Sequence, residues 1–285
     1  LGDVYKRQAL ISVFHKRIQP KAKKKVNQSA DTFWSKLVVG KPIIAVILGL
    51  VLLGAASIPV THMRLGIPDD GVKPPHATEK KAYDIMSDKF GEGFNGQIPM
   101  LINVKNKKDQ PEELQKDLQQ VMKDVNGMKN VSIVAPPMMS NSNDYALMTI
   151  IPKHGPQSEK TDVLVKDLRD YHDKAKSKYG FDTEISGQNV INIDMSKKLN
   201  DAIPVFASII VALAFILLMV VFRSLLIPLK AVLGFILSLT ATLGFTTFIM
   251  QDGFLNQLFG VHETAPVLAF LPVIVIGILF GLAMD

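Results

Sequence analysis

Residues 270–285 read FLPVIVIGILFGLAMD, an apolar stretch whose only charged side chain is the carboxylate of Asp285. A bilayer core is crossed by about 20 apolar residues, and four segments of the chain reach that length without an internal charge. We therefore expect an α-helical membrane bundle with four transmembrane helices. They are assigned to residues 42–62, 201–222, 231–250 and 264–285, the last of them truncated.

The charged residues lie outside these segments and predict the orientation of the chain. Residues 1–41 contain ten Lys and Arg against two Asp and Glu, whereas residues 63–200 contain twenty of each sign. A basic arm beside a span marks the cytoplasmic side and can touch anionic lipid. We expect residues 9–41 to be a cytoplasmic linker and residues 63–200 to be an extracytoplasmic domain in a multi-pass protein of the cell membrane. The arm's position beside a span favours the lipid bilayer over nucleic acid as its partner.

The two short loops between the later spans agree with this orientation. Residues 223–230 contain Arg223 and Lys230 and are expected inside, whereas residues 251–263 contain acids without Lys or Arg and are expected outside. The chain has no cysteine, so an exported domain must be held together by its own core rather than by disulfides.

The first eight residues, LGDVYKRQ, look like a translated sequencing adaptor and are excluded from the interpretation. Together with the end of the chain at Asp285, they lead us to expect a reading frame that is clipped at both ends.

The expected outer domain alternates strand and helix patterns. Proline, acids and a closing glycine mark residues 110–127 as a helix with Leu114, Leu118, Val121, Met122 and Val125 on one face. A second helix is expected over residues 158–180, ended by Gly180. Strands are expected at residues 98–105, 131–135, 144–152 and 181–186. The order βαββαβ predicts an inserted α/β domain of the ferredoxin-like type.

Few residues of the outer domain suggest chemistry. The glycine-rich stretch GEGFNG at residues 91–96 lacks the Lys-Ser/Thr pair of a phosphate loop and is interpreted as a tight turn. The two acids of PDDG at residues 68–71 lack the spacing of a calcium loop. The histidines are scattered without a zinc-binding pair: His62, His76, His154, His172 and His262. We expect no cofactor, no metal and no enzymatic activity.

Asp285 is the candidate functional residue on physical grounds. A carboxylate within a membrane span is costly and usually faces a bundle interior or a wet cavity, where it has a task such as carrying a proton. The alternative is that the span ends at Met284 and that Asp285 lies at the cytoplasmic surface. The spacing alone leaves both readings open.

Four stretches together resemble the second half of MMPL-type transporters of the RND superfamily. They are RLGIPDDG (64–71), AYDIMSDKFGEGFNG (82–96), VFRSLLIPLKA (221–231) and FLPVIVIGILFGLAMD (270–285). The resemblance implies that the outer domain is a porter domain and that Asp285 belongs to a proton relay whose next residue would be tyrosine. It also implies a proton-motive-force-driven exporter of lipids, fatty acids or lipophilic drugs. The missing N-terminal half of the transporter would be the main partner, and the oligomeric state is open.

Three alternatives stay open at this point. An ATP-driven permease subunit of the FtsX or MacB kind has a similar arrangement of spans but needs a separate ATPase and no intramembrane acid. A receptor or assembly scaffold would use its spans only as anchors. A SecDF-like export component would use the same proton chemistry on another cargo.

Overall fold

The structure is a computed structural model that describes residues 39–284, with side chains described as far as Leu282. The adaptor-like residues 1–8, most of the expected linker and Asp285 lie outside the described residues. The chain divides into two units between Leu52 and Leu53. The second unit contains the sheet and the later helices.

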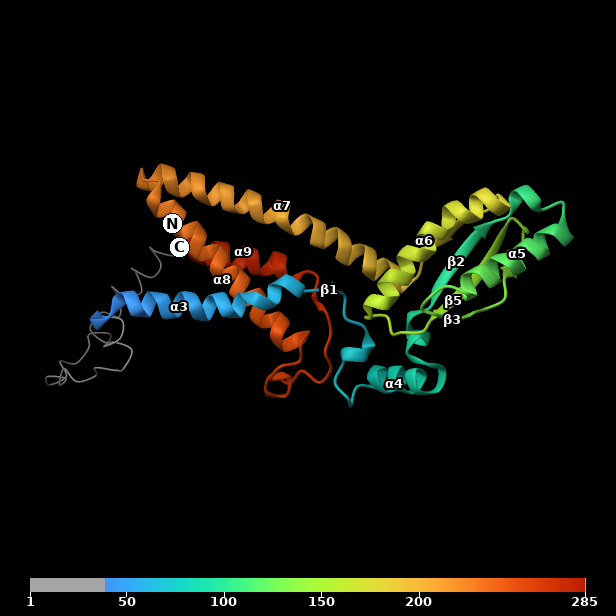
Figure 1. The fold of residues 1–285 in the computed structure, drawn as a ribbon, viewed down its shortest axis with the longest axis horizontal. Coiled ribbons are helices and arrows are strands. Elements are labelled where there is room, and N and C mark those ends of the chain that lie inside the picture. Colours follow the sequence, from blue (N-terminus) through green and yellow to red (C-terminus); the bar gives the residue numbers. More distant parts are fainter. Residues whose placement is uncertain (1–38, 285) are drawn as a thin grey trace, which may run out of the picture. The chain divides into compact units, whose positions relative to one another are not determined.

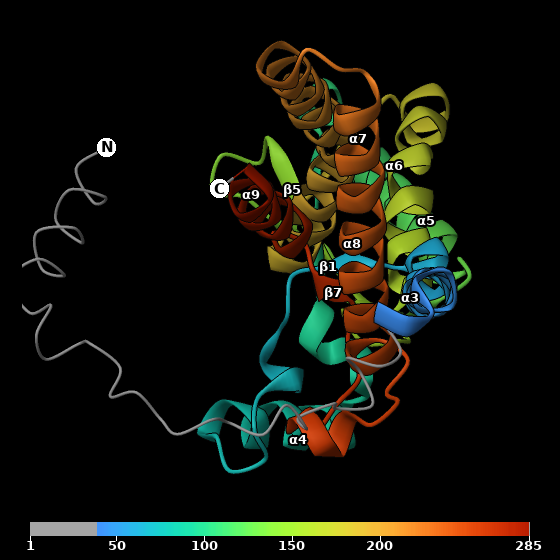
Figure 2. The same cartoon turned by 90° about the vertical axis from the view of Figure 1, so that its left-hand side faces the viewer.

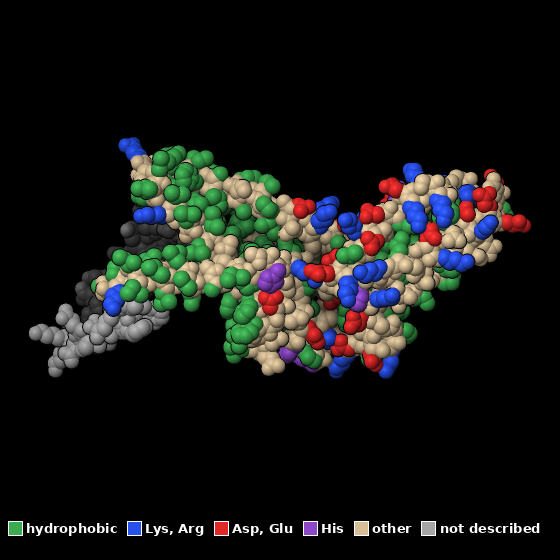
Figure 3. Space-filling model, viewed as in Figure 1, with side chains coloured by type: hydrophobic (Ala, Val, Ile, Leu, Met, Phe, Trp, Pro, Cys, Tyr) green, Lys and Arg blue, Asp and Glu red, His purple; other side chains and the backbone are tan. Residues whose placement is uncertain are grey.

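Three helices of the described residues are long and apolar enough to cross a membrane. The first is α3 (Pro42–Ser57), which continues as the 3-10 helix η1 (Ile58–His62). The others are α7 (Gln188–Phe222) and α8 (Leu226–Met250), which pack against each other (Figures 1 and 2). Apolar side chains gather over α7 and α8, whereas most charged side chains lie over the sheet and its helices (Figure 3). The chain therefore has membrane-like helices joined to a polar α/β part.

Two boundaries of these helices differ from the prediction. The second span was expected to begin at residue 201, but α7 begins at Gln188. Hydropathy marks only the apolar part of a helix, and the polar residues before it continue the same helix. The loop expected at residues 223–230 is also much shorter, because α8 begins at Leu226. Arg223 ends α7 in a left-handed conformation with φ of 47°.

The last apolar segment is a helix of 14 residues, α9 (Leu271–Met284). The prediction that this helix begins at residue 264 is wrong, because residues 264–270 are not helical. They contain β7 (Val267–Leu268), which pairs in parallel with β1 (Leu65–Gly66). Pro272 lies in the first turn of α9, where a missing N–H is tolerated.

The polar part contains an antiparallel sheet of order β3-β5-β2-β6, with the short strand β4 added beside β5. All six strands and helices expected from the sequence are observed, with bounds shifted by at most two residues. They are β2 (Ile98–Asn103), α5 (Pro111–Asn126), β3 (Val131–Val134), β5 (Tyr145–Pro152), α6 (Glu159–Tyr179) and β6 (Asp182–Ile185); β4 (Met138–Met139) is additional.

One face of the sheet holds the core. Ile98, Met100 and Ile102 of β2 are fully buried, whereas Leu101 between them is 42% exposed. Alternate residues of a strand point to opposite faces, so α5 and α6 cover one face of the sheet. The predicted apolar face of α5 is confirmed, because its five side chains are all buried or packed against this core: Leu114, Leu118, Val121, Met122 and Val125.

The glycine-rich stretch is a turn that packs closely on the sheet. It follows α4 (Thr78–Phe90) and forms the 3-10 helix η3 (Glu92–Gly96). A Cβ on Gly93 would stand 1.8 Å from the carbonyl oxygen of Pro152, so no larger residue fits there. Asn95 fastens the turn to α4 by donating to the carbonyl oxygen of Tyr83 at 3.1 Å. The interpretation of this stretch as a tight turn is confirmed.

Further short 3-10 helices are η2 (Asp70–Val72), η4 (Lys105–Lys107) and η5 (Asn256–Phe259).

The apolar helices share a second, smaller core. Leu239 and Leu243 of α8 and Ile276 of α9 are buried, with partly buried residues of η1 and α7 around them. α8 also meets the end of α3 at very short range, because a Cβ on Gly244 would stand 2.1 Å from the carbonyl oxygen of Ala56. Small residues allow such close approach between membrane helices.

Candidate functional site

The candidate site is the place where the segment that follows the first span meets the α/β part. Asp285, the site residue predicted from the sequence, lies outside the described residues, and its role remains a prediction. The described residues bring together another set of polar side chains around residues 63–67, which we call the junction segment.

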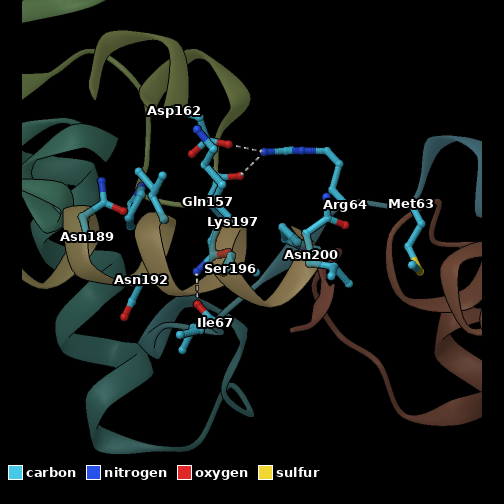
Figure 4. A pocket seen from close by; sticks show the side chains of 15 residues that line it. Met63, Arg64, Ile67, Gln157, Asp162, Asn189, Asn192, Ser196, Lys197 and Asn200 are labelled. Atoms are coloured by element: carbon cyan, nitrogen blue, oxygen red, sulfur yellow. Dashed lines mark hydrogen bonds and ion pairs between the residues drawn. The ribbon is translucent and has the colours of Figure 1, made fainter. Parts of the chain in front are cut away.

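Arg64 connects the junction segment to α6 (Figure 4). Its guanidinium forms ion pairs with Asp162 at 3.0 Å and with Glu159 at 3.2 Å. Both carboxylates lie in the first turn of α6, which Ser158 caps by accepting the backbone N–H of Lys160. Negative side chains are favoured at a helix N-terminus, so the cap both starts the helix and presents two acids to Arg64.

The backbone of Arg64 forms hydrogen bonds to the segments that follow α8 and precede α9. The N–H of Arg64 donates to the side-chain oxygen of Gln251 at 2.8 Å, just beyond α8, and its carbonyl oxygen accepts the N–H of Val267 at 2.8 Å. The side chain of Gln251 in turn donates to the carbonyl oxygen of His62. One residue therefore bonds to the end of α8 and to β7 through its backbone and to the α/β part through its side chain.

Two further contacts fix the junction segment. Gln157 donates from Nε2 to the carbonyl oxygen of Ile67 at 2.8 Å. Gly66 lies against Pro266, where a Cβ would stand 2.8 Å from the proline ring.

In the PDDG stretch, Asp69 caps η2 by accepting the N–H of Gly71 at 2.9 Å, and burial raises the pKa of its carboxyl group. The stretch therefore stabilises the local backbone at the start of the polar part.

A cavity of about 280 Å³ lies between the junction segment, the N-terminus of α6 and the first turns of α7 (Figure 4). We call it the junction cavity. Its α7 wall is a polar stripe at spacings of three and four residues, so these side chains share one helix face. The stripe consists of Asn189, Asn192, Ser196 and Asn200, and the other walls include Arg64, Gln157, Asp162, Lys197 and Pro266.

Two side chains of the stripe are buried with unused hydrogen-bonding capacity. Asn189 is 7% exposed and Ser196 is 9% exposed. The Nδ2 atom of Asn189 and the hydroxyl of Ser196 have no hydrogen-bond partner among the described residues. A buried polar group left in this way costs about 1–3 kcal/mol. The arrangement reduces stability at the cavity wall, which is typical of a functional site.

The charged side chains of the cavity nearly balance one another. Burial raises the pKa of the Asp162 carboxyl group above its ordinary value of 3.8, and the attraction of Arg64 only partly opposes this effect. Arg64 is already paired with Asp162 and Glu159. The cavity therefore presents amide and hydroxyl groups and a compensated ion pair beside apolar side chains such as Met63 and Ile193, with Lys197 at its exposed rim.

Replacing Asp162 with Asn should change the pH dependence of stability in a defined direction. In the wild-type protein the folded state holds more protons than the unfolded state between pH 3.8 and the raised pKa of Asp162. Its contribution to the free energy of unfolding is therefore complete below pH 3.8 and is lost as pH rises through the raised pKa. Asp162→Asn should gain stability relative to wild type as pH rises from 4 to 7, measured by thermal unfolding.

Asp182 supplies a control, because its contribution to stability changes with pH in the opposite direction to that of Asp162. Lys176 lowers the pKa of Asp182, which stabilises the fold above the ordinary pKa and loses this effect at lower pH. Asp182→Asn should therefore lose stability relative to wild type as pH rises through the lowered pKa towards 3.8, and the difference should change little from pH 4 to 7. If the unfolding temperatures of the two variants, each relative to wild type, changed with pH in the same way, the assigned pKa directions of Asp162 and Asp182 would be contradicted.

The sequence points to the stretch RLGIPDDG (64–71) that contains Arg64, but not to the side chains that Arg64 meets. The α7 stripe could have been found from four short polar residues that recur on one helix face just before a membrane span. The pairing of Arg64 with Asp162 joins residues 98 positions apart and has no local signal. Within the described part of the chain, no group of three or more His, Cys, Asp and Glu could hold a metal ion.

Comparison with known proteins places this arrangement in a family. Residues 71–283 match the family model described as the MMPL family. The chain is 43% identical to the membrane protein YdfJ of Bacillus subtilis over 279 residues, which is 97% of the chain. It is 24% identical to the mycolic acid-containing lipids exporter MmpL11 and 23% identical to the trehalose monomycolate exporter MmpL3, both of Mycolicibacterium smegmatis, over 89% of its length.

These relatives are much longer than the chain. It spans 38% of YdfJ, 26% of MmpL11 and 25% of MmpL3. The match to the family model nevertheless covers most of the chain, from Gly71, just beyond the junction segment, to the last turn of α9. The chain belongs to the MMPL family.

Proposed function

We propose that the chain is part of a proton-motive-force-driven exporter of lipids, fatty acids or lipophilic drugs. Two relatives are named as lipid exporters, and apolar helices long enough to cross a membrane fit a role at the bilayer. Family membership gives no support to an ATP-driven permease or to a SecDF-like component. Because the chain covers little of its relatives, the transport activity belongs to the full-length protein.

We propose further that α3, α7, α8 and α9 are four transmembrane helices and that the α/β part is an extracytoplasmic porter domain of the ferredoxin-like type. The sheet order β3-β5-β2-β6, with α5 and α6 on one face, supports the domain type. The placement of the basic arm inside and the porter domain outside follows from the positive-inside rule.

The observation that carries the proposal is the continuous helix α7. Its 35 residues extend over about 52 Å at a rise of about 1.5 Å per residue, whereas the hydrocarbon core is about 30 Å thick. About 20 Å of the same helix therefore lies beyond the apolar region and forms a wall of the junction cavity. A movement of this span in the membrane would reach the porter domain without an intervening loop.

Arg64 gives the second mechanical link. Its backbone is bonded to the outer ends of α8 and β7, and its side chain is bonded to α6. A shift of the outer ends of the spans would therefore pull on the first turn of α6. In the proposed mechanism Asp285 takes up and releases a proton, the spans move, and α7 and Arg64 transmit the movement to the porter domain.

The proposal is tested with the full-length protein in vesicles that hold a fluorescent fatty acid. An imposed proton gradient should drive transport of the fatty acid in the absence of ATP, and a protonophore should stop it. Transport that requires ATP and ignores the gradient would reject the proposal.

A further inference from the structure

The loop beyond α8 folds back along this helix. We call residues 252–263, which include η5, the return segment. The N–H of Phe254 donates to the carbonyl oxygen of Phe248 at 3.1 Å, and the ring centroids of these two residues are 4.5 Å apart. The ring of Phe259 lies edge-on to that of Phe245, with the centroids 6.2 Å apart. The return segment therefore lies beside the last turns of α8.

Left-handed backbone conformations make this reversal possible. Gly253, Leu255 and Gly260 have φ of 74°, 56° and 70°. Glycine adopts this conformation easily, whereas a bulky residue such as leucine does so only under strain. The N–H of Val261 donates to the carbonyl oxygen of Asn256 at 2.8 Å and closes the turn. A strained conformation persists only where its surroundings determine it, so the return segment is a defined structure.

The large apolar side chains of the return segment are exposed. Leu258 is 76% exposed, and its apolar neighbours at positions 254, 255 and 259 are half exposed. This spacing places all four on one face of a helical turn, and residues 253–261 contain no Lys, Arg, Asp or Glu. Apolar side chains gather over this loop in Figure 3. An exposed apolar patch of this kind marks an interaction surface.

The position of the patch along α8 points to lipid as its partner. Phe245, which Phe259 contacts, precedes the end of α8 at Met250 by five positions, or about 7 Å at a rise of about 1.5 Å per residue. α8 has 25 residues and is therefore only about 7 Å longer than a hydrocarbon core of about 30 Å. The contact thus lies at the edge of the hydrocarbon, where amphipathic segments bury an apolar face about 5–10 Å deep.

Charged groups hold both ends of the return segment on the polar side. Nε2 of His62 lies 3.1 Å from the carboxylate of Asp252 at its start. Lys80 of α4 forms an ion pair with Glu263 at its end, with a separation of 3.5 Å. The uncharged middle contacts the aromatic side chains of α8 instead. Polar ends around an apolar middle are typical of a segment that lies in a bilayer interface.

We propose that the return segment inserts its four apolar side chains into the outer leaflet of the membrane and anchors the outer end of α8. Its partner is the boundary between lipid head groups and acyl chains. This inference rests on the proposed placement of α8 across the membrane and is independent of the cargo. Because Glu263 is paired with Lys80, the anchor also holds α4 close to the membrane surface.

The test measures the depth of a fluorescent label at Leu258→Cys in the full-length protein, which carries no other cysteine and is reconstituted in lipid nanodiscs. One set of lipids carries a nitroxide high on the acyl chain, and a second set carries it near the end of the chain. Iodide quenches from the water. We expect the shallow nitroxide to quench this label about threefold more than the deep one, and iodide to quench it little.

Two further labels provide the controls. Ile236→Cys lies at a half-exposed position near the middle of α8 and should be quenched most by the deep nitroxide. Met138→Cys on β4 replaces an apolar side chain that is 70% exposed, much like Leu258. It should be quenched by iodide and by neither nitroxide. All three positions are at least partly exposed, so the label should not prevent folding.

A charged substitution tests the same contact in another way. With the label at Leu255→Cys, Leu258→Asp should reduce quenching by the shallow nitroxide about threefold, because a carboxylate is unfavourable among acyl chains. The matched variant Gln257→Asp adds the same charge at the next position, between the apolar side chains, and should leave quenching unchanged. Equal quenching in the two variants would contradict the insertion.

Two other results would overturn the inference while the label at residue 236 is quenched by the deep nitroxide. If iodide reaches the label at residue 258 and the nitroxides do not, the return segment is a solvated loop. If none of the three quenchers reaches it, another part of the full-length protein covers the patch. A label at residue 236 that no nitroxide quenches would instead reject the placement of α8 across the membrane, and with it this part of the proposed function.

Discussion

Asp285→Asn in the full-length protein is expected to reduce gradient-driven export to the level seen with a collapsed gradient. Asparagine keeps the size and polarity of the side chain but cannot take up or release a proton at physiological pH. Carboxylates within membrane spans commonly serve as proton carriers. The measurement is the initial rate of export of a fluorescent fatty acid under an imposed proton gradient, normalised to the amount of inserted protein.

Asp201→Asn is the matched control. Asp201 is an exposed carboxylate near the start of the apolar part of α7, so the substitution removes the same group outside the proposed relay. It should leave the export rate within about twofold of wild type. If Asp285→Asn exports as fast as wild type, Asp285 lies at the cytoplasmic surface and the proton relay must be sought elsewhere.

Gly244→Val is expected to disrupt the packing of the helices and to leave little correctly assembled protein. Even one added carbon would stand 2.1 Å from the carbonyl oxygen of Ala56 and 3.0 Å from the Cα of Ser57. Both contacts are to backbone, which cannot move aside by a change of rotamer. Overpacking of this kind costs about 1–3 kcal/mol and sometimes more, and the hydrogen-bonding contact between Ser57 and Thr240 at 3.0 Å would be strained as well.

Gly234→Val on the same helix provides the comparison. Gly234 has nothing within 4 Å of the position of an added Cβ, and the change in intrinsic helix propensity is the same at both positions. Thermal aggregation of the membrane-extracted protein should begin several degrees lower for Gly244→Val than for Gly234→Val. Similar midpoints for the two variants would show that propensity, rather than contact with the end of α3, determines the effect.

Patterns between residues close in sequence were sufficient to predict the helices and strands of the α/β part. The amphipathic spacing of α5 requires one side of the helix to be buried, and the structure meets this requirement. The apolar stretch at residues 98–105 predicts a strand, and β2 forms there. The glycine-rich turn was also recognisable, because glycine clusters before a strand favour close approach. These features depend on residues that are near one another in sequence.

The predicted element bounds differ from the structure where a partner distant in sequence, or a polar stretch that continues a helix, determines the local structure. Residues 264–270 are apolar enough to continue a span, but β1 pairs with β7 and holds this stretch out of a helix. α7 extends farther than its apolar part because hydropathy does not report helix boundaries. The junction cavity could not be predicted for the same reason, since its walls come from four separate parts of the chain.

The short pairing between β1 and β7 has a consequence for the order in which the molecule is assembled. It joins Leu65 to Val267, so it closes a loop of some two hundred residues, and closure of long loops is entropically unfavourable until other contacts have formed. The sheet and its helices are complete by Ile185 and depend on much shorter separations, which favours earlier formation. The pairing of β1 with β7 can therefore form only after Val267 has been synthesised, whereas the continuous helix α7, which ends at Phe222, joins the α/β part to an apolar helix earlier in synthesis.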